Sequence, residues 1–344
     1  MMIGRAPLRI SFGGGGTDLE AYYARYGGMV ISASINKYVY GTVTKNFDSC
    51  FQVISADLQS VYNSANIAAE TSELKLPRAV LDHFGLNGSF NLFTASEVPP
   101  GTGLGSSGTT AVNLVNIFST LMDRPMTKEQ VADTAFHIET VKLGAPVGKQ
   151  DQYASAFGGI NCFRFGPDGV TVEPLRLPAS TIRRLERSMM LFFTGNSRQA
   201  WAILQQQRES TSREEGIVIE SLHEIKCLAV KMRSALETGD LDGLGRLMDE
   251  SWQQKKRLSA KISNEQIDQA YLAAKRAGAL GGKITGAGGG GFLLFYCPPE
   301  GHQSVRLALE ALGLREMRFA FEFQGARVLM NTTNMEPNIG WGEE

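Results

Sequence analysis

The sequence predicts a two-domain protein built from both helices and strands. Its 344 residues exceed the usual size of one hydrophobic core, and 43% of them are hydrophobic, so two cores that share a cleft are expected. The first half contains segments rich in β-branched and aromatic residues, whereas residues 198–277 have a largely helical pattern. Alternating strand and helix patterns return over residues 283–329. We therefore place the domain boundary near residues 170–185.

Elements of the first half follow from residue type and periodicity. Apolar residues spaced three and four apart predict helices at 107–122 and 127–142, and Thr127 is suited to cap the second helix, with Glu129 close behind. A hairpin with its turn at Pro167-Asp168-Gly169 ends this half. Runs of β-branched and aromatic residues predict three strands, at residues 7–12, 29–43 and 89–98.

The second half is predicted to be mainly helical. Its long helical stretch should be interrupted at Gly239-Asp240 and again near Ser263-Asn264, because glycine, serine, asparagine and aspartate favour helix ends. Two further strands are expected at residues 291–297 and 317–323, on either side of a helix at residues 303–312.

Composition excludes several classes of partner. Lysine and arginine number 34 against 35 acidic residues, so the net charge of −1 gives no general attraction to nucleic acid or to acidic membranes. The N-terminus lacks an apolar signal segment, and no apolar run approaches the roughly 20 residues of a membrane helix. We expect a cytoplasmic protein with a small-molecule partner. No C-x-x-C pair occurs, and buried free thiols are expected at all four cysteines: Cys50, Cys162, Cys227 and Cys297.

Glycine is concentrated in three clusters. Much of the chain's total of 38 glycines lies within residues 12–18, 101–108 and 281–292. This distribution is too irregular for a repeat protein and too local for a linker. Because the clusters come from both sides of the predicted boundary, they indicate a ligand site at the domain junction.

The middle cluster matches the pattern G-x-G-x-x-G between Gly103 and Gly108, but familiar nucleotide motifs do not fit it. A dinucleotide site would need an acid at the end of the next strand, whereas Asp123 ends a helix. No H-R-D or D-F-G of a protein kinase follows, and a Walker loop would require G-K-[ST]. What remains is a glycine turn leading into a helix N-terminus, which attracts phosphate. Alternatively, Ser106 or Ser107 merely caps that helix.

Three motifs in family order resemble those of the GHMP small-molecule kinases. They read APLRISFGGGGTD at residues 6–18, PPGTGLGSSGT at 99–109 and GKITGAGGGGF at 282–292. The resemblance implies an α+β fold of two domains with ATP in the cleft. Residues 1–175 would form an N-terminal ATP-binding domain like domain 2 of ribosomal protein S5, and residues 176–344 a ferredoxin-like C-terminal domain. The ATP-binding loop would comprise Pro100, Gly101, Gly103, Leu104, Gly105, Ser106, Ser107 and Gly108.

The same resemblance assigns the chemistry of phosphoryl transfer to four residues. Asp151 corresponds to the general base, and Arg9 to a cation that offsets charge on the transferring phosphate. Ser107 and Glu139 correspond to the ligands of Mg²⁺, which prefers hard oxygen donors. The alternatives are a turn residue for Asp151, an exposed strand cation for Arg9 and a solvated helix carboxylate for Glu139.

Acceptor binding is expected near the first and third glycine clusters. Asp18 could instead cap the helix that follows it, and the third cluster could be only a tight strand connection. The residues expected to contact the acceptor are Gly15, Gly16, Thr17, Asp18, Gly288 and Gly289.

The first motif departs from the galactokinase form and is more similar to that of bacterial D-glycero-D-manno-heptose 7-phosphate kinases. This resemblance implies transfer to the anomeric hydroxyl, giving a 1,7-bisphosphate for nucleotide-activated heptose and surface polysaccharide. The acceptor's own phosphate would need a second anion site, for which Lys149, Ser197 and Arg198 are candidates. Lys149 could instead be a surface residue, and Arg198 could simply begin a helix. Other possibilities are an L-fucose kinase, a sugar and ATP sensor without catalysis, and a decarboxylase of the same fold.

Overall fold

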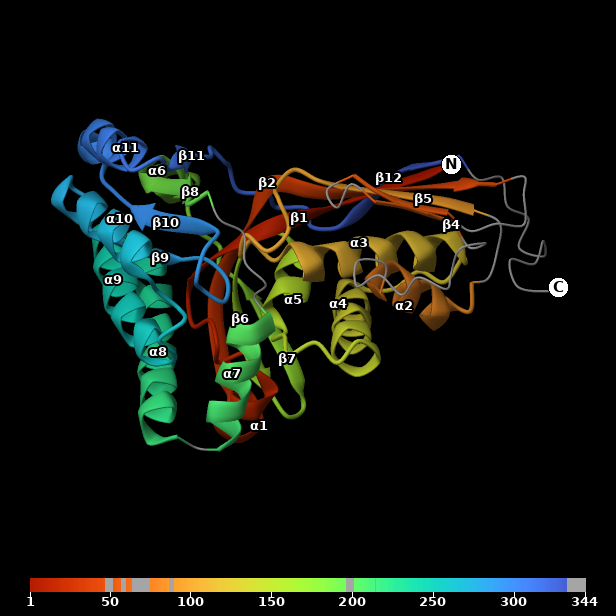
Figure 1. The fold of residues 1–344 in the computed structure, drawn as a ribbon, viewed down its shortest axis with the longest axis horizontal. Helices are drawn as coiled ribbons and strands as arrows, with labels where there is room; N and C mark the ends of the chain where they lie inside the picture. Colours follow the sequence, from red (N-terminus) through yellow and green to blue (C-terminus); the bar gives the residue numbers. More distant parts are fainter. Residues whose placement is uncertain are drawn as a thin grey trace.

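A computed structural model of the chain describes residues 1–46, 52–56, 60–63, 75–86, 90–195, 201–213 and 215–332. Two sheets lie end to end, and helices cover them on either side of a central junction (Figure 1). The long antiparallel pair β1 (Met2–Gly13) and β2 (Gly28–Lys45) runs from the larger sheet into this junction.

Within the described residues, the first sheet has eight strands, with β1 and β2 at its centre. Its main path runs β12-β1-β2-β5-β3-β4, and β6 extends it by pairing with β2 and with β7. The remaining strands of this sheet are β3 (Gln52–Ser55), β4 (Ser60–Asn63), β5 (Phe90–Ser96), β6 (Ile160–Gly166), β7 (Gly169–Pro174) and β12 (Arg327–Asn331).

Helix α3 (Ser106–Leu121) is the central helix against the first sheet. It is buried along most of its length because its small and apolar residues, such as Ile117 and Phe118, fill the core beneath β1 and β2. The other helices of this part are α1 (Glu20–Tyr26), α2 (Lys75–Phe84), α4 (Lys128–His137) and α5 (Gln150–Phe157).

A register shift divides the β1–β2 pair between two cores. The pairing shifts between Pro7 and Leu8, and beyond it Leu8, Ile10 and Phe12 pack with Met232 of α8 (Gly216–Thr238). A bulge of this kind increases local twist and redirects the strand. The first motif therefore enters the junction as a rigid strand that is buried on both faces.

The second sheet has the order β11-β8-β10-β9. Helices α8, α9 and α10 stand beside this sheet (Figure 1). Its strands are β8 (Met189–Phe193), β9 (Gly281–Ile284), β10 (Phe292–Tyr296) and β11 (Arg315–Glu316). The helices of this half are α6 (Ala179–Ser188), α7 (Trp201–Ser212), α9 (Leu241–Arg257), α10 (Glu265–Arg276), the 3-10 turn η4 (Pro299–Gly301) and α11 (His302–Glu310).

The predicted helix ends are confirmed where capping residues mark them. Thr127 caps α4 in a reciprocal capping box, whose partner is Gln130. Asp240 and Asn264 each accept a backbone hydrogen bond at the start of α9 and α10. The predicted helix at 127–142 is instead two segments, because α4 passes into a π-helical segment, η3 (Ile138–Lys142).

The expected strand at residues 317–323 is wrong. This segment is extended, but it crosses from the second sheet to the first and forms only an isolated bridge between Phe321 and Ile35. The chain then forms β12, which pairs with β1 in the first sheet. The end of the described chain thus belongs structurally to the first domain, although the boundary near residues 170–185 assigned it to the second.

The burial of the cysteines and the hydropathy of the helices test two further predictions. Cys162 and Cys297 are buried free thiols as expected, but Cys227 is exposed, and Cys50 lies outside the described residues. Within the described segments, no helix combines the length and apolar character needed to cross a bilayer.

Candidate active site

The predicted ATP-binding loop, called the phosphate loop below, leads directly into the N-terminus of α3. Gly105 is the residue before the helix and adopts a left-handed conformation with φ of 81°, and no side chain caps this end. The alternative in which Ser106 or Ser107 acts only as a cap is therefore wrong. The first backbone N–H groups of α3 stay free for an anion in a cleft that Ser106 and Ser107 line.

Not every predicted residue of this loop faces the cleft. Leu104 is buried in the core, while its carbonyl oxygen accepts from the backbone N–H of Arg9. Gly108 lies against Asp151, where a Cβ would approach the aspartate Cβ to 2.9 Å. Pro100 is exposed and does not line the cleft, which is formed on this side by Gly101, Gly103, Gly105, Ser106 and Ser107.

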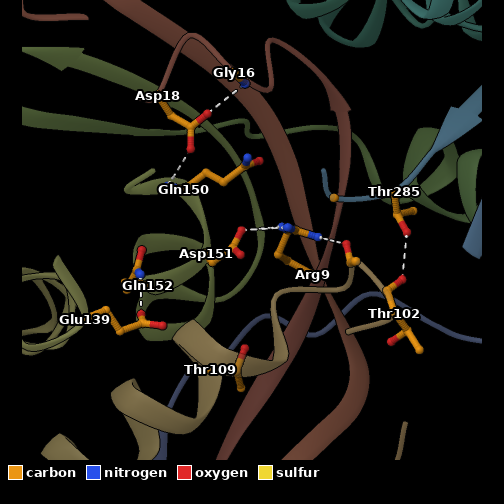
Figure 2. A network of polar contacts seen from close by, with 12 residues as sticks. Arg9, Gly16, Asp18, Thr102, Thr109, Glu139, Gln150, Asp151, Gln152 and Thr285 are labelled. Carbon is orange, nitrogen blue, oxygen red and sulfur yellow. Dashed lines mark hydrogen bonds and ion pairs between the residues drawn. The ribbon is translucent and has the colours of Figure 1, made fainter. Parts of the chain in front are cut away.

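The third glycine cluster packs against the loop. A Cβ at Gly286 would lie 2.5 Å from the Cα of Gly103, and one at Gly103 would lie 2.5 Å from the carbonyl oxygen of Thr285. The Thr285 hydroxyl donates to the carbonyl oxygen of Thr102 (Figure 2). The two halves of the molecule thus meet backbone to backbone beside the cleft, where only glycine fits.

Arg9, which is buried, and Asp151, which is partly exposed to the cleft, form an ion pair at the centre of the site (Figure 2). The Nε and one terminal nitrogen of Arg9 contact the same carboxylate oxygen of Asp151, at 2.8 and 2.7 Å. The other terminal nitrogen donates to the carbonyl oxygen of Gly103 at 2.6 Å. Arg9 therefore fixes Asp151 relative to the loop, and neither residue is an exposed strand cation or a simple turn residue.

Glu139 is fully enclosed next to the start of α3. The Ser107 hydroxyl donates to one of its carboxylate oxygens at 2.6 Å, and the Gln152 amide donates to the other at 2.5 Å. Burial raises the pKa of Glu139 to about 7, although both hydrogen bonds oppose that shift. The π-helical segment η3 holds this carboxylate inward, so it is not a solvated helix residue.

Ser107 and Glu139 fit a divalent cation chemically. Their hydroxyl and carboxylate oxygens are hard donors that already touch each other. Glu139 has no cationic partner among the described residues, so a metal charge would stabilise its carboxylate. No cluster of three or more acidic, histidine or cysteine side chains accompanies them in the described part of the chain. Phosphate oxygens and water would have to complete the coordination, as is common for Mg²⁺.

Asp18 joins the first glycine cluster to α5 rather than capping α1, whose first turn receives no side-chain cap. Its two carboxylate oxygens accept from the backbone N–H groups of Gly16 and Gln150, at 2.9 and 3.3 Å. Burial raises the pKa of Asp18 above its usual value, and these backbone donors oppose the shift. Asp18 lines the same cleft as Gly15 and Gly16.

Four predicted residues lie elsewhere. The Thr17 hydroxyl is buried and bonded to the backbone of Gly14 and Met29. Gly288 and Gly289 pack on Ile262, while Gly286 and Ala287 face the cleft. The Lys149 ammonium lies 3.9 Å from a carboxylate oxygen of Asp133, beside the rings of Tyr23 and Phe136.

The two remaining candidates for the second anion site, Ser197 and Arg198, lie outside the described residues.

Lys149 misses the cleft for a simple geometric reason. Residues two apart share one face only in an extended segment, so Lys149 would face the same way as Asp151 if this part of the chain were extended. The segment is instead the start of α5, and Lys149 has helical backbone angles. Residues two apart on a helix point in different directions.

Two buried lysines also line the cleft, although the sequence analysis did not assign them to the site. Lys283 comes from β9 and Lys255 from α9, and both are accompanied by Gln207 of α7. Lys283 is the one charged residue within the third glycine cluster, residues 281–292, which is a detectable signal. Lys255 follows Met248 and Trp252 at helical spacing, and this spacing indicates a position on the buried face of α9.

The cleft has a volume of about 160 Å³ and collects residues from both halves of the chain. A helix N-terminus and a glycine turn suit phosphate, and a serine–glutamate pair suits a metal ion. A carboxylate fixed by arginine can orient a hydroxyl and accept its proton. The fold and the site together define a phosphotransferase that acts on a small molecule.

Comparisons with known proteins give the family. The model of the GHMP kinases N terminal domain matches residues 71–159, and that of the GHMP kinases C terminal matches residues 232–313. A D-glycero-alpha-D-manno-heptose 7-phosphate kinase of Campylobacter jejuni is 34% identical over 331 residues, covering 94% of this chain and 97% of that protein. The chain belongs to the GHMP kinases.

Solved structures and a second relative agree with this family. The crystal structure of a D-glycero-D-manno-heptose 1-phosphate kinase from Bacteroides thetaiotaomicron has a TM-score of 0.78 and 29% identity, covering 97% of this chain and 100% of that one. A bifunctional fucokinase/GDP-fucose pyrophosphorylase of Arabidopsis thaliana is 27% identical over 88% of this chain but only 30% of its own. The predicted α+β two-domain GHMP kinase fold is thereby confirmed.

Proposed function

We propose that this kinase transfers the γ-phosphoryl group of ATP to the anomeric C1 hydroxyl of D-glycero-D-manno-heptose 7-phosphate, giving the 1,7-bisphosphate. The observation that carries the proposal is the 34% identity, over nearly the full length of both chains, to a heptose 7-phosphate kinase. The fucokinase relative supports an L-fucose kinase as the second candidate, at lower identity and over a smaller share of the relative.

The ion pair between Arg9 and Asp151 supplies the central step of the proposed reaction. The Asp151 carboxylate accepts the proton of the C1 hydroxyl as that oxygen bonds to the γ-phosphorus, and the bond to ADP breaks. A loose transition state demands little proton transfer until late, so a carboxylate is a sufficient base. Arg9 holds this carboxylate against the phosphate loop and offsets charge on the phosphoryl oxygens.

Ser107 and Glu139 would hold Mg²⁺, which neutralises phosphate charge when bound. Their direct contact at 2.6 Å and the burial of Glu139 support this assignment. ATP phosphates would rest on the N-terminus of α3 and on the backbone between Gly101 and Ser107.

The sugar would lie between the first glycine cluster and Asp151. Gly15 and Gly16 leave the backbone open to a ligand, and Asp18 retains acceptor capacity beyond the two backbone bonds it makes. Its remaining lone pairs could accept from sugar hydroxyls. A product activated at C1 suits later transfer to a nucleotide, so we place the enzyme in the cytoplasm, ahead of nucleotide-activated heptose and surface polysaccharide.

The proposal is tested by ADP release from purified protein with ATP and Mg²⁺ across a panel of acceptors. The panel contains the heptose 7-phosphate, mannose 6-phosphate, L-fucose, galactose and mevalonate. We expect turnover confined to the heptose phosphate. Turnover with L-fucose alone would establish the second candidate, and ATP binding without turnover of any acceptor would favour a sensor.

Substitution of Asp18 by asparagine should weaken acceptor binding selectively. The amide group replaces one acceptor oxygen with a donor, which opposes the backbone N–H of Gln150 or of Gly16 and removes lone pairs for sugar hydroxyls. We expect KM for the sugar to rise by about 10-fold or more, with KM for ATP changed less than about 3-fold. Steady-state kinetics with each substrate varied in turn will measure this, and equal changes in both constants would contradict the assignment.

A further inference from the structure

Two lysines in the cleft have no anionic partner among the described residues. Lys255 is 7% exposed, and its ammonium group donates to the carbonyl oxygen of Gly286. Lys283 is 4% exposed, and within the described residues its ammonium group makes neither a hydrogen bond nor a salt bridge. A buried ammonium group is costly unless an anion or polar groups surround it.

The electrostatics of the cleft indicate a missing negative charge. Burial lowers the pKa of Lys255 to about 8 and the pKa of Lys283 well below its usual value. The Arg9 charge adds to both shifts, and the charge of Lys255 adds to that of Lys283. Asp18 opposes the shifts, but no salt bridge joins it to either lysine among the described residues, and its oxygens accept from the backbone of Gly16 and Gln150. Asp151 is already paired with Arg9.

Unpartnered polar atoms accompany the lysines. The side-chain nitrogen of Gln207 and the hydroxyl of Ser11 are both buried and lack a hydrogen-bond partner in the structure. Both residues line the same cleft as the two lysines. Buried polar groups are nearly always satisfied, so these atoms point to a ligand that carries hydrogen-bond acceptors.

The two lysines lie beside the first and third glycine clusters, and the third cluster packs against the phosphate loop at Gly103. Lys255 contacts the third glycine cluster at Gly286, and both lysines interact electrostatically with Asp18 of the first. Gln207 lies over Gly16, where a Cβ would approach its side-chain nitrogen to 2.4 Å. The proposed metal ligands instead stand at the start of α3, on Ser107 and η3.

We propose that Lys255 and Lys283, together with Gln207 and Ser11, bind the phosphate group that the acceptor sugar already carries. This assignment rests on the proposed function, in which the acceptor is a sugar phosphate. Two lysine charges match a phosphate dianion, and the amide and hydroxyl donate to its oxygens. These residues take the role for which Lys149 was a candidate, because the Lys149 ammonium group lies beside Asp133 outside the cleft.

The decisive variants are Lys283→Met and Lys255→Met, which keep side-chain length and remove the charge. KM for heptose 7-phosphate should rise about 10- to 100-fold in each, because charge-assisted hydrogen bonds to the phosphate are lost. KM for ATP and the turnover of unphosphorylated heptose should stay within about 3-fold of wild type. Lys231→Met on the exposed face of α8 removes the same charge outside the cleft and should change none of these constants.

Folding and nucleotide binding are measured in the same variants. Thermal melting without ligand should show Tm unchanged or raised, because methionine removes a buried ammonium group that nothing neutralises. Weakened binding of ATP with unchanged binding of ADP would place Lys283 at the γ-phosphate and overturn the proposal. Equal losses with phosphorylated and unphosphorylated sugar would also overturn it.

A separate binding measurement distinguishes this proposal from the proposed function. Calorimetry with mannose 6-phosphate and with inorganic phosphate requires no turnover. If wild type binds these anions and both methionine variants bind them at least about 10-fold more weakly, the phosphate site stands even if heptose 7-phosphate is not phosphorylated. If wild type turns over heptose 7-phosphate while the variants bind and react normally, the proposed function stands and the site is wrong.

Discussion

Replacement of Asp151 by asparagine is expected to lower kcat by about 10²- to 10⁴-fold, the usual contribution of a general base. Asparagine keeps the size of the side chain and one oxygen that can accept from Arg9, so the contacts of Gly105 and Gly108 with this residue persist. The proton acceptor and its negative charge are lost. The Kd for ATP, measured by calorimetry, should change less than about 3-fold, because the loop and the N-terminus of α3 remain in place.

The matched control is Asp82→Asn. Asp82 is an exposed carboxylate of α2 whose only described ion pair is with Arg78, one turn away. Its loss removes the same charge from a surface that does not line the cleft, and kcat should remain at the wild-type value. A near wild-type kcat for the Asp151 variant would remove this residue from its proposed role.

Replacement of Gly103 by alanine is expected to reduce kcat/KM by about 100-fold, the penalty of displacing reacting groups by roughly 1 Å. Its Cβ would lie 2.5 Å from the Thr285 carbonyl oxygen, so the third glycine cluster and the phosphate loop must separate. The Gly103 carbonyl that positions Arg9 would move with them. Initial rates with ATP and acceptor varied will measure the change.

Gly85→Ala separates this steric effect from backbone strain. Gly85 follows α2 with φ of 68°, close to the 81° of Gly103, but a Cβ there would meet nothing within 4 Å. Both substitutions incur the cost of a left-handed conformation, roughly 1–2 kcal/mol. Only the Gly103 variant should lose activity. If both variants keep full activity, the contact between the two glycine clusters does not position the site.

The sequence was sufficient for features that depend on local chemistry. Helix ends at Thr127, Asp240 and Asn264 follow from hydrogen bonds between a side chain and a nearby backbone group, which a short window contains. The glycine clusters also indicated close contacts between backbone segments, because such contacts require residues without a Cβ. Their meeting at Gly103 and Gly286 needed only the expectation of a shared cleft.

Features set by tertiary context could not be predicted in this way. Residues 317–323 alternate like a strand, but their partners are supplied by two different sheets, so the segment bridges instead of joining either. The return of β12 to β1 depends on where the whole chain ends up in space. Thr17 has the right residue type for sugar binding, yet its hydroxyl is consumed by the turn it stabilises.

Lys255 shows a third reason why the sequence alone did not predict the whole site. Lys255 stands beside Lys256 and Arg257 at the end of a helix, a pattern typical of a solvated basic terminus. Only its spacing from Met248 and Trp252 places it on the buried face. The charge pattern and the apolar periodicity therefore favoured different environments, and the packing of α9 against β9 decided between them.

The position of the new phosphate on the product tests phosphoryl transfer to the anomeric hydroxyl most directly. Product formed from heptose 7-phosphate and ATP can be analysed by ³¹P and ¹H NMR after the enzyme is removed. We expect a second phosphorus signal coupled to the anomeric proton, with the phosphate at C7 unchanged. A new phosphate on any other hydroxyl, or the absence of a bisphosphate while ATP is hydrolysed, would contradict this expectation.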